Sequence, residues 1–126
     1  MLADAPAVAN IPVSDLGRAA KFYEDVLGVS RTDEFPGAYA YTAGVGSQFS
    51  VSESTGASDG SFTQMVFIVT DIEKTVDDLK ARGLIFEEYD GPFKTENGIA
   101  TVGRIKGAWF KDPEGNLLGL FQGPKG

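Results

Sequence analysis

The stretch IPVSDLGRAAKFYEDVLGV, residues 11–29, has a counterpart later in the chain, FIVTDIEKTVDDLKARGLI at residues 67–85. Each contains an apolar run typical of a strand, then an aspartate, then an amphipathic segment that reaches a glycine. Aspartate is a preferred helix N-cap because its carboxylate accepts hydrogen bonds from the free N–H groups of the first turn. Asp15 and Asp71 are therefore interpreted as caps rather than as catalytic acids, and the repeat indicates one strand–helix unit used twice.

Helical spacing of apolar residues predicts that the first helix continues to Leu27 and stops at Gly28. After each helix come three strand-like segments, separated by the turn signals FPG, AGVG and DPEGN. We expect these strands at residues 29–35, 38–43 and 48–54, and at 84–88, 100–110 and 116–122. The sequence thus predicts an α+β fold of two βαβββ modules.

The domain organisation follows from the repeat. We expect one domain over residues 1–126, with a first module at about 5–54, a polar hinge at about 55–62 and a second module at about 63–124. The segment YDGPFKTENG, residues 89–98, interrupts the second module and is interpreted as a flexible lip over a pocket.

The composition restricts the chemistry. The net charge of −7 disfavours binding to nucleic acid, and the absence of cysteine rules out disulfides and thiolate nucleophiles. The chain has no histidine, which removes the usual acid–base catalyst and the commonest transition-metal ligand. No signal segment or long apolar stretch occurs, so we expect a cytoplasmic protein with no membrane partner.

The repeat, the FYEDVLG motif at residues 22–28 and the WFKDPEGN motif at residues 109–116 resemble the vicinal oxygen chelate (VOC) superfamily, also called the glyoxalase, bleomycin resistance protein and dioxygenase family. The resemblance covers nearly the whole chain. It implies strands that wrap into a U-shaped half-barrel around a cavity, helices outside, and a homodimer.

In catalytic members of that family the cavity holds a divalent metal. The ligand positions implied by the resemblance fall on Val8, Ser50, Gln64 and Gly119. Two of these side chains offer no donor atom and the other two are uncharged, whereas such metals require several imidazole or carboxylate ligands. We therefore expect no metal site, no cofactor and no catalytic residue, and an iron-dependent extradiol dioxygenase is excluded by the missing histidines.

Strand alternation sorts the residues that line the predicted cavity. If Gly119 faces the cavity, Phe121 does too, and either Trp109 or Phe110 joins them from the preceding strand. In the run AYAY we assign the tyrosines to the cavity and the alanines to close helix packing. The predicted ligand-binding residues are Asn10, Tyr39, Tyr41, Ser50, Gln64, Trp109, Gly119 and Phe121.

These features favour a metal-independent protein that binds a small aromatic or cationic molecule, such as an antibiotic or a toxic metabolite. An alternative is a glyoxalase-like lyase, isomerase or epimerase with an atypical or absent metal site. A third hypothesis is a regulatory domain without a small ligand, in which aromatic side chains close the cavity.

Overall fold

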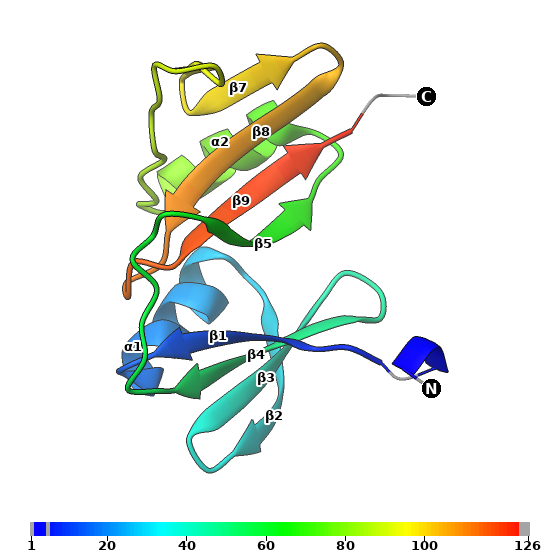
Figure 1. Ribbon diagram of the computed structural model, residues 1–126, viewed down its shortest axis with the longest axis vertical. Helices are drawn as coiled ribbons and strands as arrows, with labels where there is room; N and C mark the ends of the chain where they lie inside the picture. The colour runs from blue at the N-terminus through cyan, green and yellow to red at the C-terminus, as the bar shows by residue number, and fades with distance from the viewer. Residues whose placement is uncertain (1, 5, 124–126) are drawn as a thin grey trace. The chain divides into compact units, whose positions relative to one another are not determined.

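The computed structural model describes residues 2–4 and 6–123 and divides into two compact units between Ala57 and Ser58 (Figure 1). Each unit is a sheet with its helix against one face, as the contacts of α1 with β4 and of α2 with β8 and β9 show. The first unit has the βαβββ order, and the second has the same order with one further short strand, β6, after its helix; this confirms the predicted α+β class, and each sheet is open rather than closed into a barrel.

The first unit contains an initial 3₁₀ turn, a short helix with a π-helical continuation, and four strands. Its elements are η1 (Leu2–Asp4), β1 (Ala9–Val13), α1 (Leu16–Lys21), η2 (Phe22–Val26), β2 (Ser30–Phe35), β3 (Ala38–Ala43) and β4 (Ser47–Glu53). The strand order is β1-β4-β3-β2, and β1 runs parallel to β4 while the other pairs are antiparallel.

The first helix begins where the sequence predicts. The Asp15 carboxylate accepts a hydrogen bond from the Arg18 N–H at 3.0 Å, so Asp15 is an N-cap. The second half of the helix differs from the prediction, because residues Phe22–Val26 form a π-helical turn in which Leu27 N–H donates to Phe22 O at 3.0 Å. Gly28 then adopts a φ of 73°, which ends the helix.

The second unit has one helix and five strands. Its elements are β5 (Thr63–Ile68), α2 (Ile72–Ala81), β6 (Thr95–Glu96), β7 (Ile99–Val102), β8 (Ile105–Lys111) and β9 (Leu117–Gln122). The strand order is β5-β9-β8-β7-β6, with β5 parallel to β9.

Two side chains satisfy the first N–H groups of α2. The Asp71 carboxylate accepts from Lys74 N–H at 3.2 Å, which confirms the second predicted cap. Gln122 at the end of β9 accepts from Ile72 N–H at 2.8 Å through its side-chain oxygen. Gln122 is buried, so this bond fixes the start of the helix to the last strand and leaves fewer free N–H groups at the helix end.

Two predicted strands of the second unit are wrong. The expected strand at 100–110 is a hairpin of β7 and β8 that turns at Gly103, whose φ is 62°; glycine is favoured at such a turn because it adopts positive φ without strain. The expected strand at 84–88 makes only an isolated bridge between Phe86 and Phe110.

The turn between β8 and β9 is held by a buried carboxylate. One oxygen of Asp112 accepts from the N–H groups of Glu114 and Asn116, both at 2.9 Å, and the other accepts from the Asn116 side-chain amide at 2.8 Å. Asp112 and Asn116 are 4% and 1% exposed. The aspartate and the asparagine of DPEGN therefore shape the turn that joins the neighbouring strands β8 and β9.

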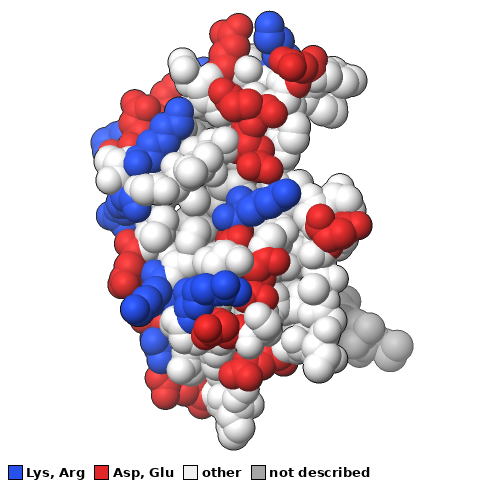
Figure 2. Space-filling model, turned by 90° about the vertical axis from the view of Figure 1, so that its left-hand side faces the viewer, with Lys and Arg blue, Asp and Glu red and all other residues white. Residues whose placement is uncertain are grey.

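Charged side chains are interspersed on the surface drawn in Figure 2, where Lys and Arg lie among Asp and Glu. In the part of the chain that the structure covers, no helix has the length and apolar character needed to cross a membrane.

Candidate functional site

Trp109 lies on the face of the second sheet opposite α2, above two glycines. In the β8–β9 ladder Trp109 is paired with Gly119. A Cβ atom on Gly119 would stand 3.3 Å from Cδ1 of the indole, and one on Gly107 would stand 3.1 Å from Cη2 at the other end of the ring. The indole therefore extends over both glycines, and side chains at either position would displace it.

The Trp109 ring forms part of the wall of a cavity of about 660 Å³ inside the second unit. A second aromatic ring, Tyr89, meets the indole edge to face, with centroids 5.8 Å apart and an interplanar angle of 72°. The cavity is lined by Gly60, Ser61, Thr63, Tyr89, Asp90, Gly91, Pro92, Phe93, Trp109 and Leu117. Its volume falls in the range of small-molecule sites, and most of its wall is aromatic or apolar.

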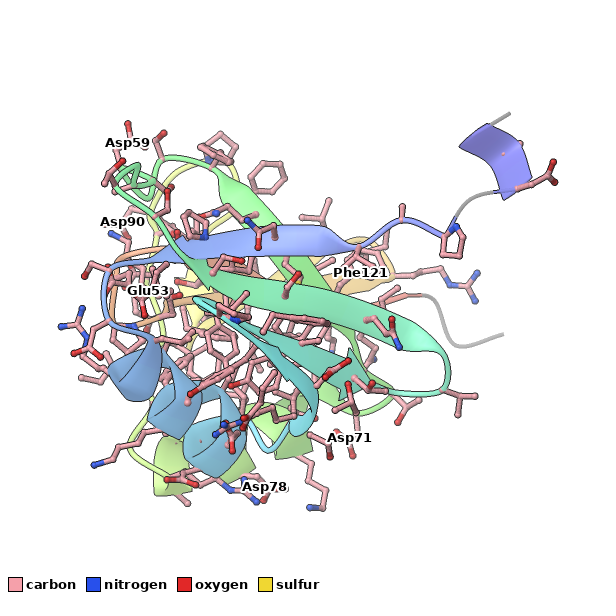
Figure 3. All side chains as sticks on the ribbon, turned by 90° about the horizontal axis from the view of Figure 1, so that it is seen from below. Glu53, Asp59, Asp71, Asp78, Asp90 and Phe121 are labelled. Carbon is pink, nitrogen blue, oxygen red and sulfur yellow. The ribbon has the colours of Figure 1, made fainter. Side chains whose placement is uncertain are left out.

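The polar groups of the cavity wall are hydroxyls, backbone groups and one carboxylate. Asp90 lies in the wall, and Asp59 precedes Gly60; both are labelled in Figure 3 on segments that border the cavity. Asp59 accepts from Ser61 N–H at 2.9 Å, and hydrogen bonds with the side chain and backbone of Ser61 hold the pKa of Asp59 below its usual value. Asp59 thus remains ionised, which favours a cationic group near the cavity.

Burial raises the pKa of the Tyr89 phenol, with a further contribution from the charge of Glu87. The phenol therefore stays neutral near pH 7 and supplies an aromatic face and a hydrogen-bonding hydroxyl rather than a phenolate.

Of the predicted residues of the second unit, Trp109 lines the cavity, whereas Gln64, Gly119 and Phe121 are not among its lining residues. Trp109 borders the cavity while Phe110 is fully buried, which resolves the choice between them. Gly119 lies beneath the indole, and Phe121 is half-buried two residues further along β9. Gln64 sits where the β5–β9 register shifts, and its buried side-chain oxygen is the one such atom in the described chain without a hydrogen-bond partner.

Two predicted residues of the first unit lie on its open face. Asn10 and Ser50 are paired in the parallel β1–β4 ladder. The next pair along the two strands, Ile11 and Val51, points to the opposite face and is buried. The Asn10 side-chain oxygen accepts from the Ser52 hydroxyl at 2.7 Å. This face therefore carries amide and hydroxyl groups, as the alternation predicts, although none of them lines the aromatic cavity.

The prediction that Tyr39 and Tyr41 face the cavity is wrong. Tyr41 is fully buried, stacks on Phe49 with ring centroids 5.5 Å apart, and donates to a Glu24 carboxylate oxygen at 2.9 Å. Tyr39 shares its face and lies under the Arg31 guanidinium, 4.0 Å from the ring centroid. Both therefore belong to the helix side of the first sheet, and the alanines of AYAY lie on the open side.

Glu24 also binds Arg31 at 2.7 Å, so the tyrosine hydroxyl and the guanidinium share one carboxylate oxygen. Burial and the bond to Glu24 raise the pKa of Tyr41 well above its ordinary value. This cluster stabilises the core of the first unit rather than a ligand site.

Tyr89 and Phe93 line the cavity but are not among the residues that the sequence predicts for the site. A sequence signal for them existed, because two aromatic residues flank the Asp-Gly-Pro turn in the segment expected to be a lip. In the structure, five residues of this segment, 89–93, line the cavity.

The metal positions implied by the resemblance do not fit a metal. Val8 and Gly119 have no donor atoms, and Ser50 and Gln64 offer only neutral oxygens or nitrogens. Among residues 2–4 and 6–123 no group of three or more Asp, Glu, His or Cys side chains is arranged to hold a metal ion. The available donors therefore lack the charge that divalent metals require.

Several solved structures share the fold. A glyoxalase/bleomycin resistance protein/dioxygenase from Nocardioides is 20% identical, with a TM-score of 0.65 over 98% of this chain and 87% of that one. The fosfomycin resistance protein FosX from Listeria monocytogenes is 14% identical, with a TM-score of 0.73 over 95% and 93%. TnmS3, an antibiotic binding protein from a Streptomyces species, is 25% identical, with a TM-score of 0.67 over 94% and 98%.

No curated protein matches the sequence. The family model of the Glyoxalase/Bleomycin resistance protein/Dioxygenase superfamily matches residues 6–120, a span that reaches into β9 and includes all residues that line the aromatic cavity. The chain therefore belongs to the glyoxalase/bleomycin resistance protein/dioxygenase superfamily.

Proposed function

We propose that the protein is a metal-independent binding protein that sequesters a small aromatic or cationic compound, such as an antibiotic or a toxic metabolite. The observation that carries this proposal is the Trp109 indole, which spans Gly107 and Gly119 in the wall of a cavity of about 660 Å³. Because neither glycine has a side chain that would displace the indole, the ring keeps its place in the cavity wall, where a planar ligand can stack on it.

The chemistry of the wall favours an aromatic ligand with positive charge. Trp109, Tyr89 and Phe93 offer π surfaces, which attract both flat rings and cations. Asp90 in the wall and the ionised Asp59 next to it add negative charge, in agreement with the net charge of −7. A planar anion would meet the same surface without this electrostatic gain.

The names of two relatives support a role in binding antibiotics. TnmS3 is described as an antibiotic binding protein and FosX as a fosfomycin resistance protein. The likeness to TnmS3 extends over nearly all of both chains.

An enzymatic role would require a carboxylate or metal at the cavity that can accept a proton or activate a substrate. Asp112 is the buried carboxylate of the described chain, but its oxygens are engaged by Glu114 and Asn116 in the turn. Asp90 is exposed. No contact of either residue favours catalysis over binding.

Trp109 is the single tryptophan of the chain, so its emission reports directly on the cavity. We expect bleomycin, mitomycin C or the planar cation proflavine to quench it saturably, and the anion 1-naphthoate to quench it less. The variant Trp109→Leu should lose the thermal stabilisation that the bound compound gives to the original protein, while the control Ile85→Ala, at an exposed position outside the cavity wall, should retain it. Equal stabilisation of Trp109→Leu and the original protein would show that the compound binds elsewhere.

A homodimer and a cytoplasmic location, which the sequence led us to expect, belong to the same proposal. Sedimentation equilibrium should give twice the monomer mass of 13.4 kDa. A monomer at all concentrations would remove the dimer from the proposal and leave the cavity unaffected, because its lining residues all belong to the second unit.

A further inference from the structure

The segment between Tyr89 and Thr95 is closed at its base and exposed at its tip. Tyr89 N–H donates to the Thr95 hydroxyl oxygen at 2.8 Å, and Thr95 N–H donates to Tyr89 O at 3.0 Å. Thr95 is 7% exposed, whereas every residue from 90 to 94 is exposed. The two hydrogen bonds therefore form a clasp that fixes the ends of a five-residue loop.

Both ends of this loop are attached to the sheet. On one side Glu87 N–H donates to Trp109 O at 2.8 Å, and Tyr89 packs edge to face on the indole. On the other side Thr95 is paired with Ala100 in the β6–β7 ladder. Because both ends are held in this way, movement of the loop is restricted to its tip.

The tip carries an apolar ring over the cavity. Phe93 is 57% exposed although it lines the cavity together with Trp109. An exposed phenylalanine gains free energy if it is covered, and a ligand lying on Trp109 would cover it. Gly91 permits a change of backbone angles because it has no side chain, while Pro92 restricts the backbone next to Phe93.

We propose that residues 90–94 form a lid whose Phe93 ring closes on an aromatic ligand bound against Trp109, with the Tyr89–Thr95 clasp as its fixed base. This inference rests on the proposed function, since it requires a ligand in the cavity. It identifies Phe93 as the residue that retains the ligand and Trp109 as the surface that receives it. Removal of the Phe93 ring should therefore increase the dissociation rate more than it lowers the association rate.

The test is stopped-flow fluorescence of Trp109 with proflavine as the probe. Phe93→Ala should raise the dissociation rate constant by about fivefold, as the loss of one aromatic contact implies, and Phe93→Leu should raise it less. Thr95→Val, which removes the clasp hydroxyl, should also raise it. The control Ile85→Ala, at an 81% exposed position outside the cavity wall, should behave like the original protein.

Limited proteolysis provides a second readout, because Lys94 in the tip is a trypsin site. Saturating proflavine should slow cleavage after Lys94 in the original protein but not in Phe93→Ala. If proflavine quenches Trp109, but Phe93→Ala releases it at the rate of the original protein and is protected from cleavage to the same extent, the lid alone is overturned. Absence of any quenching at millimolar proflavine would count against the proposed function and against the lid that depends on it.

Discussion

Trp109 and Gly119 face each other across the β8–β9 ladder, and the indole Cδ1 lies 3.3 Å from the position that a Cβ on Gly119 would take. The same Cβ would stand 3.1 Å from Val66 Cγ1 and 3.3 Å from the backbone oxygen of Ala108. The glycine in the middle of the last strand is therefore a requirement of close packing beneath the tryptophan.

Gly119→Ala should lower the free energy of unfolding by about 1 kcal/mol. The added methyl group overpacks the folded strand, and this cost exceeds the stabilisation that comes from the lower conformational entropy of the unfolded chain. The indole should move, which changes the emission maximum of Trp109 and weakens ligand binding. Urea denaturation and fluorescence spectra measure both effects. The control Gly123→Ala should be nearly neutral, since its Cβ would meet only Phe121 Cε1, at 3.8 Å. Equal stability of the two variants would contradict the packing role of Gly119.

Gly119→Glu tests the position at which the resemblance implies a metal-binding carboxylate. The longer side chain should displace the indole and weaken ligand binding, and it should not create a metal site, because Val8 and Gln64 supply no further charge. Isothermal titration with zinc, nickel and manganese should show no tight binding. Stoichiometric uptake of any of these metals by the variant would contradict the account of the donor set.

Tyr41 should make stability depend on alkaline pH. Burial and the Glu24 bond raise its pKa in the folded protein, whereas an unfolded tyrosine titrates near pH 10. A raised pKa in the folded state gives stability that is complete below about pH 10 and is lost as the pH rises towards the folded value. The urea midpoint should therefore fall more between pH 9 and 11 in the original protein than in Tyr41→Phe, and parallel curves would show that Tyr41 does not contribute.

Asp112→Asn should lower the free energy of unfolding by about 1–3 kcal/mol. Both oxygens of the Asp112 carboxylate accept hydrogen bonds, so in either orientation of the new amide its NH₂ group would face an N–H donor. Thermal denaturation measures the loss, and Asp25→Asn at an exposed helical position is the matched control. A melting temperature unchanged in Asp112→Asn would mean that the turn does not depend on the buried charge.

Much of the fold was predictable because its signals are local. The caps Asp15 and Asp71 and the stop at Gly28 depend on neighbouring backbone groups, and each occurs as expected. The hairpin at Gly103 was missed because one glycine within a long β-rich run was not interpreted as a turn. The π-helical turn at residues 22–26 has no local signal of comparable strength.

The candidate site was predictable in part. Alternation correctly grouped Tyr39 with Tyr41, but periodicity does not determine which face of a strand is the interior. That choice depends on Glu24 and Phe49, which approach Tyr41 only in the folded unit. Trp109 and Gly119 were identified because the family motif marks the β8–β9 turn and therefore the register of both strands.

The measurement that tests the central claim most directly is a titration of the Trp109 emission with bleomycin and with proflavine, in metal-free buffer and again in the presence of EDTA. The account predicts saturable quenching by at least one of them, with the same dissociation constant in both buffers. No quenching by either compound at millimolar concentration, or quenching that disappears with EDTA and returns with zinc, would contradict it.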